Sequence, residues 1–153
     1  YIDSRFRGND KSGITFIEVI LVVAIMLTIS VMTPTFYSRF LLQNSVVTTT
    51  DQLVGSLRKA QIYSMMGKEN SQWSVNYSGN TITLFLGTTF AGHNAAFDET
   101  FSVPSNVTFN PTTFDVSFAR MSGTQSTSVT TVTVSSGTNN KTITLNAQGV
   151  VSK

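Results

Sequence analysis

The chain has 153 residues, about one domain, and 41% of them are hydrophobic, which is the balance of a folded protein. It has no cysteine and a single histidine, His93, so disulfide frameworks, cysteine-based zinc sites and thiol catalysis are excluded, and a histidine-dependent triad is not expected. The net charge of +2 and the 12% of charged residues are too sparse for a strong phosphate-binding surface, so nucleic acid is not the expected partner.

The first predicted element is an apolar run at residues 14–32, ITFIEVILVVAIMLTISVM, in which the one charged residue is Glu18. As a helix it would extend about 28 Å, close to the hydrocarbon thickness of a bilayer. Arg5, Arg7 and Lys11 precede it, and by the positive-inside rule they place the leading end in the cytoplasm. We therefore expect residues 14–33 to be a transmembrane helix, with the C-terminal domain outside the cytoplasm.

A cleaved secretory signal fits the same run less well. The run is longer than a typical signal core, and VMTP at residues 31–34 is not a small-x-small cleavage site. Glu18 also needs an explanation, because an ionisable group costs about 2.5 to 3.5 kcal/mol at mid-bilayer. Either its carboxylate reaches the interface of an isolated anchor, or a partner neutralises it.

The segment KSGITFIE at residues 11–18, with the apolar run after it, resembles the class III signal peptides of type IV pilins and type II secretion pseudopilins. The resemblance implies a leader peptide at residues 1–13, which a prepilin peptidase cuts after Gly13. It implies N-methylation of the new terminus at Ile14, where the family more often has Phe. It also implies an assembly role for Glu18, the fifth mature residue, whose carboxylate neutralises the terminal amine of a neighbouring subunit.

The same resemblance implies partners and a location. The partners are other pilin or pseudopilin subunits, the prepilin peptidase, an inner-membrane assembly platform and membrane lipid. The location is the inner (cytoplasmic) membrane, in a single-pass orientation, followed by assembly into a pilus or pseudopilus. No cofactor or metal is implied.

The second predicted element is the periplasmic part of the helix, residues 34–68. Pro34 removes one backbone donor and predicts a kink or a local break. Beyond it, apolar residues recur at spacings of three, four and seven, which indicates one packed face. Asp51 is a candidate cap for a second helical segment, which Gly67 ends.

Residues 69–153 change from the helical period to a period of two, which predicts a β-rich globular domain. A hairpin at residues 73–86 turns at SGN, residues 78–80. Further strands are expected at residues 99–103, 106–110, 114–119, 128–135 and 141–146. The predicted core consists of Leu53, Leu57, Ala60, Trp73, Val75, Ile82, Leu84, Val132, Val134, Ile143 and Leu145.

Together these elements predict an α+β fold in which a long N-terminal transmembrane helix extends into a globular antiparallel β-sheet domain, a pilin-like arrangement. The body is also similar to minor pseudopilins of the GspH and FimT type. That similarity depends on Trp73 and on the segments LRKAQ at residues 57–61, FARMSGT at 118–124 and ITLNAQGV at 143–150.

The remaining chemical candidates have simple interpretations. His93 lies in a predicted loop without clustered ligands and is interpreted as a solvated loop histidine. Asp98 and Glu99 lack further oxygen ligands at calcium spacing and are interpreted as a solvated pair. Met65 and Met66 are interpreted as core filler rather than as a binding face. No catalytic group and no metal site is predicted, and we expect no enzymatic activity.

The resemblance implies a minor pilin or pseudopilin, a structural subunit of a type II secretion pseudopilus or type IV pilus that assembles through its N-terminal helix after leader cleavage. The alternative is a FimT-like minor pilin that binds DNA for uptake, which needs a basic surface with aromatic side chains. Beyond residue 69 the basic side chains are Arg120, Lys141 and Lys153 alone, so the structural role is favoured.

Overall fold

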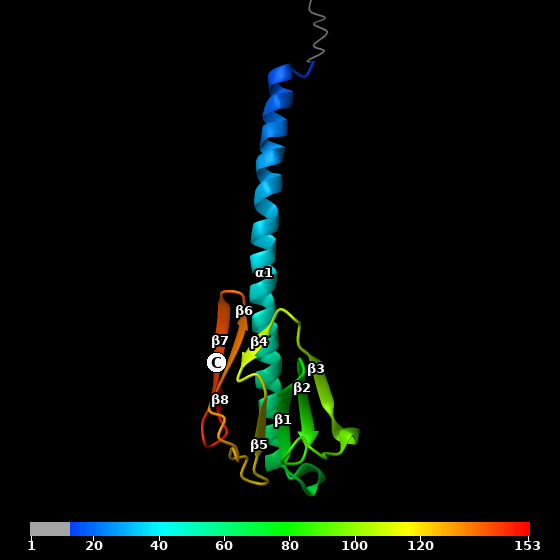
Figure 1. The fold of residues 1–153 in the computed structure, drawn as a ribbon, viewed down its shortest axis with the longest axis vertical. Coiled ribbons are helices and arrows are strands. Elements are labelled where there is room, and N and C mark those ends of the chain that lie inside the picture. Colours follow the sequence, from blue (N-terminus) through cyan, green and yellow to red (C-terminus); the bar gives the residue numbers. More distant parts are fainter. Residues whose placement is uncertain (1–12) are drawn as a thin grey trace, which may run out of the picture. The chain divides into compact units, whose positions relative to one another are not determined.

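The computed structural model describes residues 13–153, apart from the side chains of residues 32–36. The chain divides into two compact units, residues 1–38 and residues 39–153, which are described separately. Helix α1 (Phe16–Met65) begins in the first unit and ends in the second, and the described strands belong to the second (Figure 1). Of the expected leader, only Gly13 lies within the described residues.

The expected transmembrane helix is not supported. Among the residues that the structure describes, no helix is long and apolar enough to cross a membrane. The apolar part of α1 begins at Phe16 and includes the polar side chains of Thr28 and Ser30. It also carries Glu18 in its first turn. The single-pass inner-membrane location expected from the same residues is therefore corrected as well.

Helix α1 continues through both of its expected interruptions. It includes Pro34, and it passes Asp51 without a new N-terminus. Asp51 instead accepts a hydrogen bond from the Lys153 ammonium group. The hydroxyl of Thr50 donates to the carbonyl of Val46 at 2.7 Å, so this buried polar group is satisfied within the helix.

A glycine ends α1, as the sequence predicts. Gly67 has a φ of 63°, in the left-handed region, and its N–H donates to the carbonyl of Ser64 at 3.1 Å. The N–H of Met66 still donates to the carbonyl of Ile62, at 2.9 Å. A short 3₁₀ helix, η1 (Lys68–Asn70), follows and leads into the first strand.

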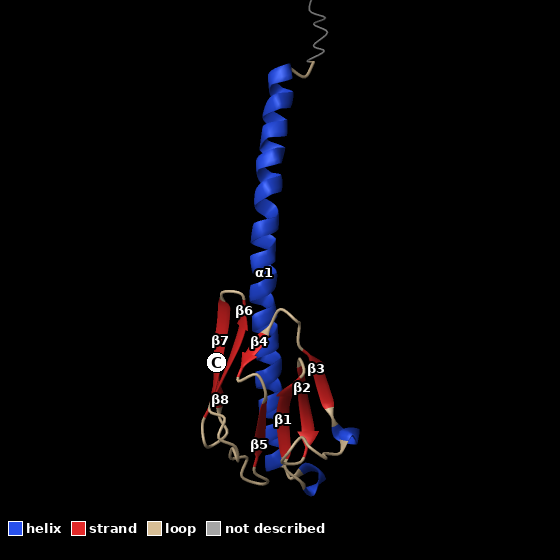
Figure 2. Cartoon of the chain, viewed as in Figure 1, coloured by secondary structure: helices blue, strands red, loops and turns tan. Residues whose placement is uncertain are grey.

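The described strands of the second unit form two four-stranded sheets, with antiparallel pairing throughout (Figure 2). The first sheet has the order β3 (Glu99–Ser102), β2 (Thr81–Leu86), β1 (Trp73–Ser78) and β5 (Phe114–Phe118). The second has the order β4 (Thr108–Asn110), β6 (Thr131–Ser136), β7 (Asn139–Leu145) and β8 (Val151–Ser152). The 3₁₀ helix η2 (Ala95–Phe97) lies in the loop between β2 and β3. The sequence predicted one sheet and did not predict β8.

The core of the second unit joins α1 to both sheets. Leu53, Leu57 and Ala60 of α1 are fully buried and belong to one cluster with the inward-facing residues of the strands. All of the predicted core residues are buried, so this prediction is confirmed. Residues 13–153 therefore form a mixed α+β fold, and none of the helices described there fits the long transmembrane helix that the sequence suggested.

Candidate functional site

The expected processing point lies in open backbone directly before α1. Gly13 and Ile14 are non-helical and exposed, with 76% of Ile14 accessible. A Cβ built on Gly13 would meet no atom within 4 Å. Among the described residues, none outside the adjacent chain therefore crowds the Cα of Gly13.

Glu18 occupies the first turn of α1, three residues after Thr15. Its N–H donates to the carbonyl of Thr15 at 3.0 Å and to the Thr15 hydroxyl at 3.4 Å. Thr15 and Glu18 form the T-x-x-E pattern of a capping box, and the helix dipole favours a carboxylate at this end. The sequence shows this pattern, but it was interpreted there only through the family's assembly role.

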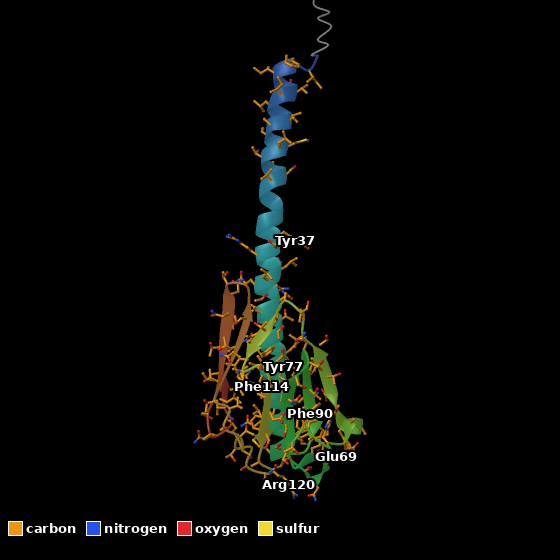
Figure 3. All side chains as sticks on the ribbon, in the orientation of Figure 1. Tyr37, Glu69, Tyr77, Phe90, Phe114 and Arg120 are labelled. Atoms are coloured by element: carbon orange, nitrogen blue, oxygen red, sulfur yellow. The ribbon has the colours of Figure 1, made fainter. Side chains whose placement is uncertain are left out.

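The side chains of residues 14–31, which we name the assembly segment, are exposed on every side of the first unit's helix (Figure 3). Its large apolar side chains have exposed fractions from 44% to 82%. They are Ile14, Phe16, Ile17, Val19, Ile20, Leu21, Val22, Val23, Ile25, Met26, Leu27, Ile29 and Val31. A helix that is apolar all round needs an apolar surrounding, because its exposed surface is unfavourable in water.

His93 lies in a loop that covers the first sheet, and the interpretation as a solvated loop histidine is wrong. The side chain is 13% exposed. Its Nε2 lies 2.8 Å from Asp98 Oδ2 and its Nδ1 lies 2.5 Å from the carbonyl oxygen of Phe90. The hydrogen bond with Asp98 is the main cause that raises the pKa of His93 above its ordinary value, and the bond to the Phe90 carbonyl adds to it.

Asp98 and Glu99 do not form the expected solvated pair, because each carboxylate has its own basic side chain as a partner. Asp98 pairs with His93, and Glu99 accepts hydrogen bonds from Lys59 Nζ of α1 at 2.6 and 2.7 Å. The bond with Glu99 raises the pKa of Lys59. Within residues 13–153, no group of three or more metal-ligating side chains comes together.

Met65 and Met66 are not core filler: they are 44% and 73% exposed at the end of α1. Met121, which is 70% exposed, lies beside them, since its N–H donates to the Ser64 carbonyl at 2.9 Å. Met65 and Met66 follow Ser64, the last buried residue of α1, and Met65 lies beside Gly123 of the loop after β5.

The three basic side chains beyond residue 69 do not form one surface. Arg120 donates to the carbonyl of Asn70 at 3.0 Å, in the loop after β5. Lys153 pairs with Asp51 and lowers the pKa of that carboxyl group, and Lys141 contributes to the same shift. Two of these three charges are therefore directed at one carboxylate of α1.

The candidate residues from the sequence therefore fall into two groups. Gly13, Ile14 and Glu18 lie in or directly before the exposed assembly segment, whereas His93 lies in a covered loop. Comparison of the chain with family models, with curated proteins and with solved structures gave no match.

Proposed function

We propose that this chain is a structural subunit of a pilus-like filament, a minor pilin or pseudopilin, which assembles through residues 14–31. The observation that supports this most is the assembly segment, whose large side chains are apolar and exposed on all sides. Burial of one such side chain is worth about 1.5–3 kcal/mol. Packing against the matching segments of other subunits would therefore stabilise an assembly strongly.

The N-terminal end of the segment supports the same role. Removal of the leader after Gly13 would leave the amine of Ile14 four residues before Glu18, at the end of α1 where a carboxylate is favourable. In a packed filament, the amine of one subunit and the carboxylate of the next compensate each other, since each is costly when buried alone.

Cysteine cross-linking tests the proposal, because the chain itself has no cysteine. Single cysteines are introduced at residues 19, 20, 21, 22 and 23 of the full chain in a cell that carries a pilus or pseudopilus machine. Ordered helix packing should give cross-linked dimers whose yield varies with the helical period of 3.6 residues, since each subunit carries one thiol. Glu18→Ala in the same background should lower the yield.

The control is Thr88→Cys, an exposed position of the second unit outside the assembly segment. A uniform yield across residues 19–23 would indicate nonspecific aggregation and contradict the proposal. Mass spectrometry of the same samples gives the mature N-terminus, for which we expect Ile14.

A further inference from the structure

Strands β1 and β2 of the first sheet are buried on both faces, although the core that includes α1 lies on only one of them. Ser74, Thr83 and Phe85 alternate along β1 and β2 with the core residues, so they lie on the outer face, and yet each is at most 4% exposed. Phe85 is fully buried but is not part of the core cluster. A segment outside the core cluster therefore covers Phe85.

The cover is the loop of residues 87–98. Phe90 and His93 of this loop lie against Phe85, with ring centroids 5.4 and 5.2 Å away. His93 also stacks on Phe90, at 4.4 Å and 20°. At the start of the loop, the hydroxyl of Ser74 donates to the carbonyl of Gly87.

Both ring nitrogens of His93 face atoms that only accept hydrogen bonds. Nδ1 faces a carbonyl oxygen, and Nε2 faces a carboxylate oxygen of Asp98. A neutral imidazole carries one N–H, so it can satisfy one of these contacts and must turn a lone pair toward the other. The closed loop therefore requires the imidazolium form.

Compensation of the Asp98 carboxylate also depends on the protonation of His93. Its Oδ1 is buried without a partner among the described residues, and its Oδ2 is bound by His93. Among the described residues, Lys59 does not replace His93, because its ammonium group is paired with Glu99 of β3, and from β2 the side chain that faces the ring is the uncharged Phe85. Loss of the proton would leave a largely buried carboxylate uncompensated, which is costly.

We propose that the loop of residues 87–98 is a pH-dependent cover, closed over Phe85 while His93 is protonated and released when His93 is neutral. The sign follows from linkage. Since the pKa of His93 is raised in the closed state, the stabilisation is complete below the ordinary value near 6.5 and is lost as pH rises through the raised pKa. Release would expose Phe85 and Phe90 as an apolar surface.

Two natural probes report on the loop in the full chain, kept in solution with a mild detergent. His93 is the only histidine and Trp73 the only tryptophan. Phe97 of η2 packs edge-on against Trp73 at 6.5 Å, so opening of the loop should change the tryptophan fluorescence. The imidazole resonances give the titration of His93 directly.

The main measurement is hydrogen exchange of the amides of Phe97 and Asp98, which donate to the carbonyls of Asn94 and Ala95. Their protection factors, corrected for the intrinsic rate at each pH, should fall roughly tenfold to hundredfold across the His93 titration, as expected for loss of one hydrogen bond to a charged group. Amides of β6 and β7 should keep their protection.

Asp98→Asn is the sharpest variant, because its amide can donate to Nε2 of a neutral imidazole while Nδ1–H still donates to Phe90. The loop should then stay closed on both sides of the titration. Glu99→Gln, which removes the neighbouring carboxylate, is the matched control and should keep the wild-type pH dependence. The proposal is overturned if His93 titrates at or below its ordinary pKa, if wild-type loop protection is unchanged across that titration, or if Asp98→Asn opens as wild type does.

Discussion

Gly149, in the loop between β7 and β8, lies where this loop meets α1 and the loop after β5 that contains Gly123. It has a φ of 80°, and a Cβ there would contact the carbonyl oxygen of Gly123 and Nε2 of Gln61. Gln61 itself donates to the carbonyls of Gly123 and Gln148, both at 3.1 Å. The glycine thus gives three chain segments the space to meet.

Gly149→Ala should lower the free energy of unfolding by about 1–2 kcal/mol for the left-handed backbone and by about 1–3 kcal/mol more for the overlap with backbone. Gly79→Ala is the matched control, because its φ is 54° but a Cβ there meets nothing within 4 Å. Urea unfolding followed by Trp73 fluorescence measures both. Equal losses in the two variants would show that the junction adjusts without cost.

Individual residues also show how far a local pattern reaches. The hydrogen bond from the Glu18 N–H to the Thr15 hydroxyl belongs to a local T-x-x-E pattern that the sequence contains, although the sequence analysis did not interpret it as a cap. The environment of His93 is not visible in the sequence, because the partners of His93 depend on how residues 87–98 fold back on β2. That segment has no regular hydrophobic period from which its fold could be predicted. Tertiary contact, rather than local pattern, decides whether such a loop residue is solvated.

Among the elements, the part of α1 in the second unit has one face that the sequence predicts well. Leu53, Leu57 and Ala60 repeat at helical spacing, and each is 0% exposed. On the same helix Ile62 is 50% exposed, since it lies on another face. The buried stripe, not helix propensity, therefore fixes how this part of α1 packs.

Leu57→Asp should unfold the second unit. The free-energy cost of burying an unpaired carboxylate is large compared with the free energy of unfolding of a small domain, about 5–15 kcal/mol. Ile62→Asp, on the exposed side of α1, should change the thermal midpoint only slightly. Circular dichroism melting of the two variants makes the comparison. A Leu57→Asp variant that melts like the parent would mean that this face of α1 does not pack on the sheets.

The period of two in the sequence predicts the strands, but it does not predict that they form two separate sheets. Alternation marks a residue as inward or outward, and it carries no information on which sheet a strand joins. Strand β8 has two residues and therefore no period at all. The burial of Phe85 on the outer face of β2 likewise arises from the loop of residues 87–98, which a strand pattern cannot show.

For the molecule as a whole, the burial of apolar side chains contributes more to stability than the ion pairs do. The ion pairs Lys59–Glu99 and Lys153–Asp51 are about half exposed, and such pairs contribute about 0–1 kcal/mol each. The core cluster lies entirely within residues 39–153, whereas the most continuous exposed apolar surface lies in residues 14–31. The core for folding therefore lies in residues 39–153, and the assembly that we propose would depend on residues 14–31.

Residues 39–153 should consequently fold without the rest of the chain, as a monomer with an α+β circular dichroism spectrum and one cooperative thermal transition. The fragment retains every residue of the core and loses the exposed apolar side chains of residues 14–31 that would drive association. Sedimentation and thermal melting measure both properties, with the full chain under the same conditions as the control. The full chain should associate. If the fragment instead associated as strongly as the full chain, the interacting surface would lie in the second unit, and the assignment of assembly to residues 14–31 would be wrong.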